Sequence, residues 1–143
     1  MTGYLDGNGD PHVRLLVRGP VYAGQDVDFL IDTGYQGFIS LPLVQAFPIG
    51  LILSGTTNIV MANGQAQPRL MCLGGVTCEG VEEVGLVVIE STGQTPLLGM
   101  DFFRRFKKKL LVDPIAQTVE IVDAGAPPAP VAVAPSPPAA PAP

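Results

Sequence analysis

The chain has 143 residues, the size of a single domain. Thirteen acidic and eight basic residues give a formal net charge of −5, which argues against a nucleic-acid-binding protein. One histidine and two cysteines are too few for a structural zinc site or a histidine-rich metal site. No stretch reaches the ~20 apolar residues of a membrane span, and no leader-like segment is visible. We therefore expect a cytoplasmic protein without a membrane partner.

The first part of the chain predicts a loose arm followed by short strands. Residues 1–10 are rich in glycine and predict a flexible N-terminal arm. Residues 6–11 resemble a calcium loop, but Pro11 stands where such a loop needs glycine, so we favour a polar turn. Apolar clusters and alternation predict strands at residues 12–18, 26–32 and 38–41. Residues 42–47 can form one helical turn that begins at Pro42.

The remaining elements continue this mostly β pattern. Asn63-Gly64 is a strong hairpin signal, so residues 51–61 and 65–73 are expected to pair around it. The best helix is predicted over residues 100–107, where Met100, Phe103 and Phe106 share one face. Apolar segments between turn residues predict further strands at residues 84–89 and 96–98. Residues 110–112 and 118–122 predict a closing hairpin.

The composition changes sharply at the end of the chain. Residues 124–143 consist mainly of proline and alanine and carry no charge. Such a segment cannot bury enough surface to offset its ordering entropy, so we predict a disordered tail. The folded domain is therefore expected to span residues 11–123.

Residues 33–68 contain no charged side chain and no histidine. A solvent-exposed segment of this length normally carries charge. Three explanations stay open for this segment: burial in the core, an apolar cleft or a subunit interface.

Asp32 is the best candidate for chemistry in this sequence. It ends a strand whose Val27, Phe29 and Ile31 form an apolar face, and Thr33-Gly34 follows at once. Thr33 offers a hydroxyl beside the carboxylate, and Gly34 permits a tight turn and the close approach of another backbone. An acid at the end of a rigid strand and open to a ligand suits general acid–base catalysis.

Three blocks of the sequence together resemble the retropepsin-like aspartic proteases. The segment Phe29-Leu30-Ile31-Asp32-Thr33-Gly34 is similar to the catalytic loop of that family. Ala62-Asn63-Gly64 stands where the family has its flap hairpin, and Pro96-Leu97-Leu98-Gly99 precedes a short helix as in the second family block. The resemblance spans residues 11–123. It implies an all-β, acid-protease-type half-barrel with one short helix and a flap hairpin.

The resemblance implies a mechanism without a covalent intermediate. Two aspartates share one proton and activate a water molecule for attack on a peptide carbonyl. Two like charges about 4 Å apart repel by ~4 kcal/mol at an effective dielectric constant near ~20, so one carboxyl stays protonated. This sequence has a single Asp-Thr-Gly, and a bilobed enzyme needs about twice this length. The resemblance therefore implies an aspartic endopeptidase that acts as a homodimer, in which each chain supplies Asp32.

The resemblance also assigns the neighbouring residues. Asp32 is the expected catalytic residue, and Thr33 and Gly34 form the active-site loop, in which Thr33 makes a hydrogen-bond grip across the subunits. The expected contacts with a polypeptide substrate are Tyr35, Gln36, Met61, Ala62, Asn63 and Gly64. No metal or organic cofactor is expected.

The chain departs from the family at two loop positions and at its ends. Tyr35 is bulkier than the alanine or serine of many relatives, and Gln36 replaces an aspartate that holds substrate ends in retroviral members. Retroviral dimers interleave their chain ends in one sheet, whereas this chain has a glycine-rich start and a Pro/Ala tail. The alternative function is a non-catalytic module of the same fold for dimerisation or peptide binding.

Other notable residues have simpler interpretations. Asp101 is expected to be structural, since it lies in the first turn of the predicted helix. The five basic residues within 104–109 are interpreted as a solvated cationic helix end, with an anion-binding patch as the alternative. Cys72 and Cys78 can approach each other across Gly74-Gly75, but free thiols are favoured without an export signal.

Overall fold

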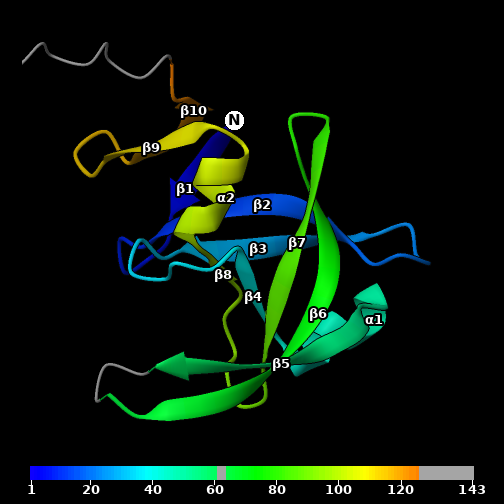
Figure 1. Ribbon diagram of the computed structural model, residues 1–143. Helices are drawn as coiled ribbons and strands as arrows, with labels where there is room; N and C mark the ends of the chain where they lie inside the picture. The colour runs from blue at the N-terminus through cyan, green and yellow to red at the C-terminus, as the bar shows by residue number, and fades with distance from the viewer. Residues whose placement is uncertain (61–63, 126–143) are drawn as a thin grey trace, which may run out of the picture.

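A computed structural model describes residues 1–60 and 64–125, and within them the chain forms short strands and two short helices (Figure 1). The strands are β1 (Thr2–Leu5), β2 (Pro11–Arg18), β3 (Gln25–Ile31), β4 (Ile39–Pro42), β5 (Ile52–Val60), β6 (Ala66–Cys78), β7 (Val81–Glu90), β8 (Leu97–Leu98), β9 (Lys108–Asp113) and β10 (Thr118–Asp123). The helices are α1 (Leu43–Ile49) and α2 (Met100–Arg105).

Six of the strands close into a mixed barrel. The hydrogen-bonded order runs β6-β7-β4-β8-β3-β2, and an additional pairing of β2 with β6 closes the ring. Two of these pairs, β3 with β8 and β4 with β7, are parallel, and the others are antiparallel. Strand β5 extends the sheet beside β6, while β1, β10 and β9 extend it beyond β2. The closed, mostly β architecture of the prediction is confirmed.

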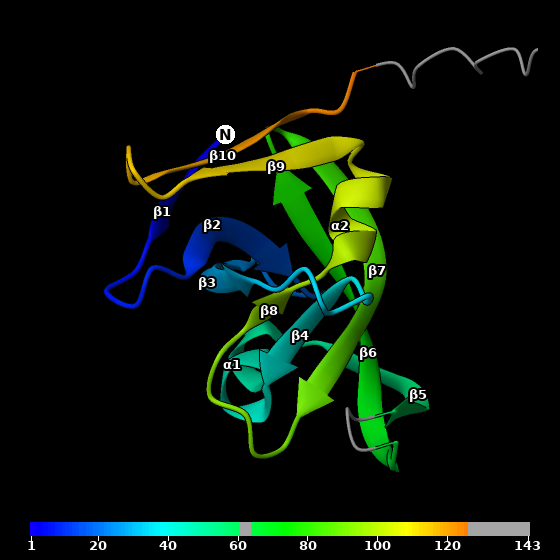
Figure 2. The same ribbon diagram turned by 90° about the vertical axis from the view of Figure 1, so that its left-hand side faces the viewer.

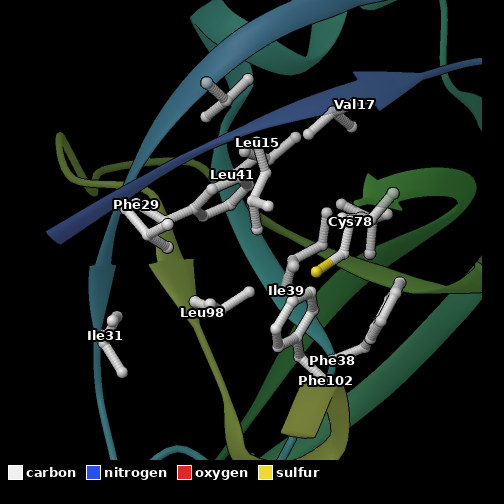
Figure 3. Close-up of a cluster of buried hydrophobic side chains, with 14 of the residues drawn as sticks. Leu15, Val17, Phe29, Ile31, Phe38, Ile39, Leu41, Cys78, Leu98 and Phe102 are labelled. Atoms are coloured by element: carbon white, nitrogen blue, oxygen red, sulfur yellow. The ribbon is translucent and has the colours of Figure 1, made fainter. Parts of the chain in front are cut away.

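Side-chain alternation explains why these strands form the barrel wall. In β2, Val13, Leu15 and Val17 are buried, whereas Arg14 and Arg18 are exposed. Figure 3 shows the resulting cluster, in which apolar side chains from β2, β3, β4, β8 and α2 meet inside the barrel. Burial of one large apolar side chain contributes roughly 1.5–3 kcal/mol, so this cluster fixes the barrel and the loops at its rim.

The prediction of one helix is corrected to two. Helix α1 follows Pro42, whose extended backbone precedes the first turn, and ends at Gly50 in the left-handed conformation with φ of 70°. Pro48 lies inside α1, where it cannot donate a backbone hydrogen bond to the preceding turn. The possible single turn at residues 42–47 is therefore a complete short helix, while α2 ends earlier than predicted, at Arg105.

The expected flexible arm contains a paired strand. Strand β1 pairs antiparallel with both β2 and β10. A Cβ atom on Gly3 would lie 2.1 Å from the carbonyl oxygen of His12, so glycine permits the close approach of β1 to β2. The following turn is polar, as expected: Asp6 Oδ1 accepts hydrogen bonds from the backbone N–H groups of Asn8 and Asp10.

The charge-free segment contributes to the core and to the surface. Ile39, Leu41 and Ile49 are buried, whereas Phe47 and Val60 are exposed. Burial in the core therefore explains the absence of charge for only part of residues 33–68.

The remaining predictions concern the cysteines, the tail and the membrane. Both cysteines are buried free thiols, in agreement with the favoured interpretation. Most of the predicted disordered tail, residues 126–143, lies outside the described residues, so the domain boundaries stay a prediction. Within the described part of the chain, no helix has both the length and the apolar character needed to cross a bilayer.

Candidate active site

The loop that carries Asp32 connects β3 to β4 and is held at both ends by β8. Strand β8 lies between β3 and β4 in the sheet, parallel to β3 and antiparallel to β4. The backbone N–H of Asp32 donates to the carbonyl oxygen of Leu98 at 3.0 Å, and that of Gly99 donates to Phe38 at 3.0 Å. The predicted Leu97-Leu98-Gly99 block therefore fixes the loop from residue 32 to residue 38.

The Asp32 carboxylate is oriented by its own loop. Its Oδ1 atom accepts a hydrogen bond from the backbone N–H of Gly34 at 2.8 Å, and the Asp32 carbonyl accepts one from Tyr35 at 3.1 Å. Asp32 is half-buried, while Thr33 and Gly34 are exposed. The structure thus presents a fixed carboxylate at the rim of the barrel, where another molecule can reach it.

Tyr35 supports the loop from inside. Its hydroxyl donates to the carbonyl oxygen of Ile39 at 3.3 Å, and burial raises the pKa of Tyr35 to about 12. A Cβ atom on Gly37 would lie 2.3 Å from the Tyr35 hydroxyl, and one on Gly99 would lie 2.6 Å from its ring. The two glycines therefore make room for the tyrosine. Its expected contact with a substrate stays a prediction.

Gln36 lies on the exposed side of the loop and contacts α2. Its Nε2 atom donates to the carbonyl oxygen of Thr33 at 3.4 Å. Arg104 donates from one terminal nitrogen to the Gln36 carbonyl oxygen at 3.0 Å. Sequence reasoning placed Arg104 in a solvated basic cluster and missed this contact, because a helix this short carries no pattern that shows which arginine turns toward a loop.

The neighbouring charges confirm the structural interpretation of Asp101. Its carboxylate accepts a hydrogen bond from Arg105 Nε at 2.6 Å, within the same helix. The Arg105 guanidinium also lies 5.3 Å from the centre of the Phe38 ring. These contacts fix α2 against the end of the loop.

The predicted flap hairpin is present in its two strands. Strands β5 and β6 pair from Val60 with Ala66 to Ile52 with Leu73. Gly64 is exposed and has a positive φ of 78°, as expected for a turn glycine. Met61, Ala62 and Asn63 lie outside the described residues, so their contact with a substrate stays a prediction. In Figure 1, the end of β5, the start of β6 and the loop after β3 lie on the same, left-hand side of the molecule.

Two further features lie apart from this loop. A pocket of about 720 Å³ lies between the turn after β2 and strands β5, β6 and β7, and none of the predicted site residues lines it. Among the described residues, no three His, Cys, Asp or Glu side chains are arranged to hold a metal ion.

Comparison with known proteins gives a family and a fold. Residues 22–105 match a family model described as "gag-polyprotein putative aspartyl protease". No curated protein matches the chain.

Two solved structures show the same fold at low sequence identity. A retropepsin-like aspartic protease from Rickettsia conorii has a TM-score of 0.57 at 20% identity, over 85% of this chain and 88% of that one. The protease of EIAV, solved with the inhibitor HBY-793, has a TM-score of 0.56 at 15% identity, over 74% of this chain and 96% of that one. The family match covers more than half of the sequence and includes the Asp32 loop and β8. The chain therefore belongs to the retropepsin-like aspartyl protease family.

Proposed function

We propose that this chain is an aspartic endopeptidase that is active as a homodimer. The observation that carries the proposal is the geometry of Asp32, whose carboxylate is held at 2.8 Å by the Gly34 N–H beside an exposed Thr33-Gly34. Family membership and the fold shared with two proteases support the same chemistry. The sequence contains one Asp-Thr-Gly, so the second carboxyl comes from a second copy of the chain.

The proposed reaction is direct attack by water on the peptide carbonyl carbon. One Asp32 carboxylate takes a proton from the water, while the protonated Asp32 of the other copy donates its proton to the carbonyl oxygen. The Asp32 that took the proton from water then donates it to the leaving nitrogen as the C–N bond breaks, and a hydroxyl of the tetrahedral intermediate returns a proton to the other Asp32. The two carboxyls share one proton between them because close like charges disfavour double ionisation.

The proposed substrate is an extended polypeptide with apolar side chains. The β5–β6 hairpin lies on the same side as the Asp32 loop, where it would close over a bound chain and exclude water (Figure 1). Val60 and Leu70 on this hairpin are 69% and 43% exposed, so they are available to an apolar ligand.

The test compares cleavage of an unstructured apolar protein by the wild type and by Asp32→Asn, between about pH 4 and pH 7. We expect cleavage by the wild type and a loss of several orders of magnitude in the variant. Asn keeps the size of the side chain but can neither accept nor donate the transferred proton. Both proteins must be shown to be dimeric and folded. An inactive wild-type dimer would refute the proposal in favour of a non-catalytic binding module.

A further inference from the structure

The turn between β9 and β10 presents an isoleucine to solvent. Ile115 is 95% exposed, the highest value among the exposed large apolar side chains of the described residues. On the adjoining strand, Leu111 and Val112 are 47% and 42% exposed, and as successive strand residues they lie on opposite faces of the hairpin. Single exposed apolar residues are common on protein surfaces, so this group needs a second reason before it indicates an interface.

The first reason is that the turn is held in one conformation. Asp113 Oδ1 accepts hydrogen bonds from the backbone N–H groups of Ile115 and Ala116, both at 2.9 Å. Gln117 Nε2 donates to the Pro114 carbonyl oxygen at 2.6 Å. Six registered residue pairs join β9 to β10 behind the turn. Because the turn is already ordered, Ile115 would lose little conformational entropy on contact with a partner.

The second reason is the direction of the hairpin. Figure 1 shows the turn between β9 and β10 on the left-hand side of the molecule, the side on which the loop after β3, the end of β5 and the start of β6 also lie. Figure 2 shows this side face on, with the β9–β10 hairpin above the loop and the β5–β6 hairpin below it. Helix α1 lies on the opposite, right-hand side in Figure 1.

The third reason is that the Asp32 site is incomplete in one chain. This argument rests on the proposed function, which requires the Asp32 carboxyls of two copies to meet across a two-fold axis. The side that carries Asp32 then faces the second copy, and every element that projects from this side must be accommodated by it. In a two-fold interface each such contact is made twice.

We propose that the β9–β10 hairpin is a dimerisation element and that Ile115 is its apolar anchor on a second copy of this chain. The hairpin is internal to the chain, so this contact does not depend on interleaved chain ends. Lys109 on β9 is exposed, and such a charge limits unspecific pairing at this end strand of the sheet. The apolar turn, rather than the strand edge, is therefore the contact we expect to determine affinity.

The test measures the dimer dissociation constant of the full chain by sedimentation equilibrium. We expect Ile115→Asp to raise this constant by about 100-fold or more, because two buried apolar contacts are lost in each dimer. Ile115→Ser should give a smaller increase in the same direction. Phe47→Asp is the matched control, since Phe47 is 85% exposed but lies on α1, and it should leave the constant unchanged.

The outcomes separate this inference from the proposed function. A dissociation constant that Ile115→Asp leaves unchanged in a folded protein would overturn the inference, even where the protein cleaves peptides. An equal rise of the dissociation constant in Phe47→Asp, or a wild-type protein that stays monomeric, would also overturn the inference. A wild-type dimer that depends on Ile115 but cleaves nothing would support the interface and refute the protease. Asp32→Asn should dimerise normally.

Discussion

Replacement of Gly99 by alanine tests whether β8 and α2 hold the active-site loop in place. A Cβ atom at this position would lie 2.2 Å from the carbonyl oxygen of Gly37 and 2.8 Å from that of Tyr35. Carbon and oxygen atoms cannot approach so closely, and the opposing atoms belong to the backbone, so the loop itself must move. Overpacking of this kind costs typically ~1–3 kcal/mol.

We expect Gly99→Ala to lower the free energy of unfolding by about 2 kcal/mol, or the melting temperature by about 8 °C for a domain of this size. The displaced loop carries Asp32, and a shift of about 1 Å at a reacting group can cost ~100-fold in rate. The expected kcat/KM of the variant for a peptide substrate is therefore about a hundredth of the wild-type value. Thermal unfolding and steady-state cleavage measure the two effects on the same preparation.

Gly7→Ala provides the matched control for this experiment. Gly7 lies in the turn after β1, where an added Cβ meets nothing within 4 Å. The control should retain wild-type stability and activity. If Gly99→Ala equalled Gly7→Ala in both measurements, the close packing of β8 and α2 against the loop would be wrong.

Two further predictions concern the same loop. Arg104→Ala removes the 3.0 Å hydrogen bond to the Gln36 carbonyl oxygen, and because Arg104 is exposed we expect the free energy of unfolding to change by less than about 1 kcal/mol. We expect kcat/KM to fall several-fold in Arg104→Ala and to be intermediate in Arg104→Lys. Unchanged kinetics would contradict a positioning role for Arg104. Tyr35 has a pKa raised to about 12 by burial, against 10.0 in the unfolded chain, so the folded state holds this proton more tightly. Its contribution to stability is complete below pH 10.0 and is lost as the pH rises toward about 12, and Tyr35→Phe should flatten this part of a stability–pH curve measured by urea unfolding.

The parts of the site that depend on short local patterns were predictable from the sequence. Apolar alternation before Asp32 placed it directly after β3, and the Asn63-Gly64 signal indicated the pairing of β5 with β6. Leu97-Leu98-Gly99 was expected beside the loop and does lie there. Each of these signals comes from a few adjacent residues, so it predicts the same local structure whatever the rest of the fold is.

The features that were missed depend on contacts between distant residues. The glycines of residues 1–10 were interpreted as flexibility, but Gly3 is the point where β1 approaches His12 of β2. Residues 42–47 predicted only one helical turn, yet α1 continues to Ile49, where Ala46 and Ile49 are buried against the barrel. The contact of Arg104 with Gln36 likewise joins two elements that only the tertiary fold brings together.

The position of β8 also has a consequence for how the protein folds. The loop after β3 is fixed only when Leu98 pairs with Ile31, and nearly half of the chain separates these two residues. Contacts between residues so far apart form slowly, because the intervening chain must first lose its freedom. We therefore expect the site to be among the last parts of the protein to become ordered after synthesis. Incompletely folded chains, whose own loops are still open to cleavage, would then have no proteolytic capacity.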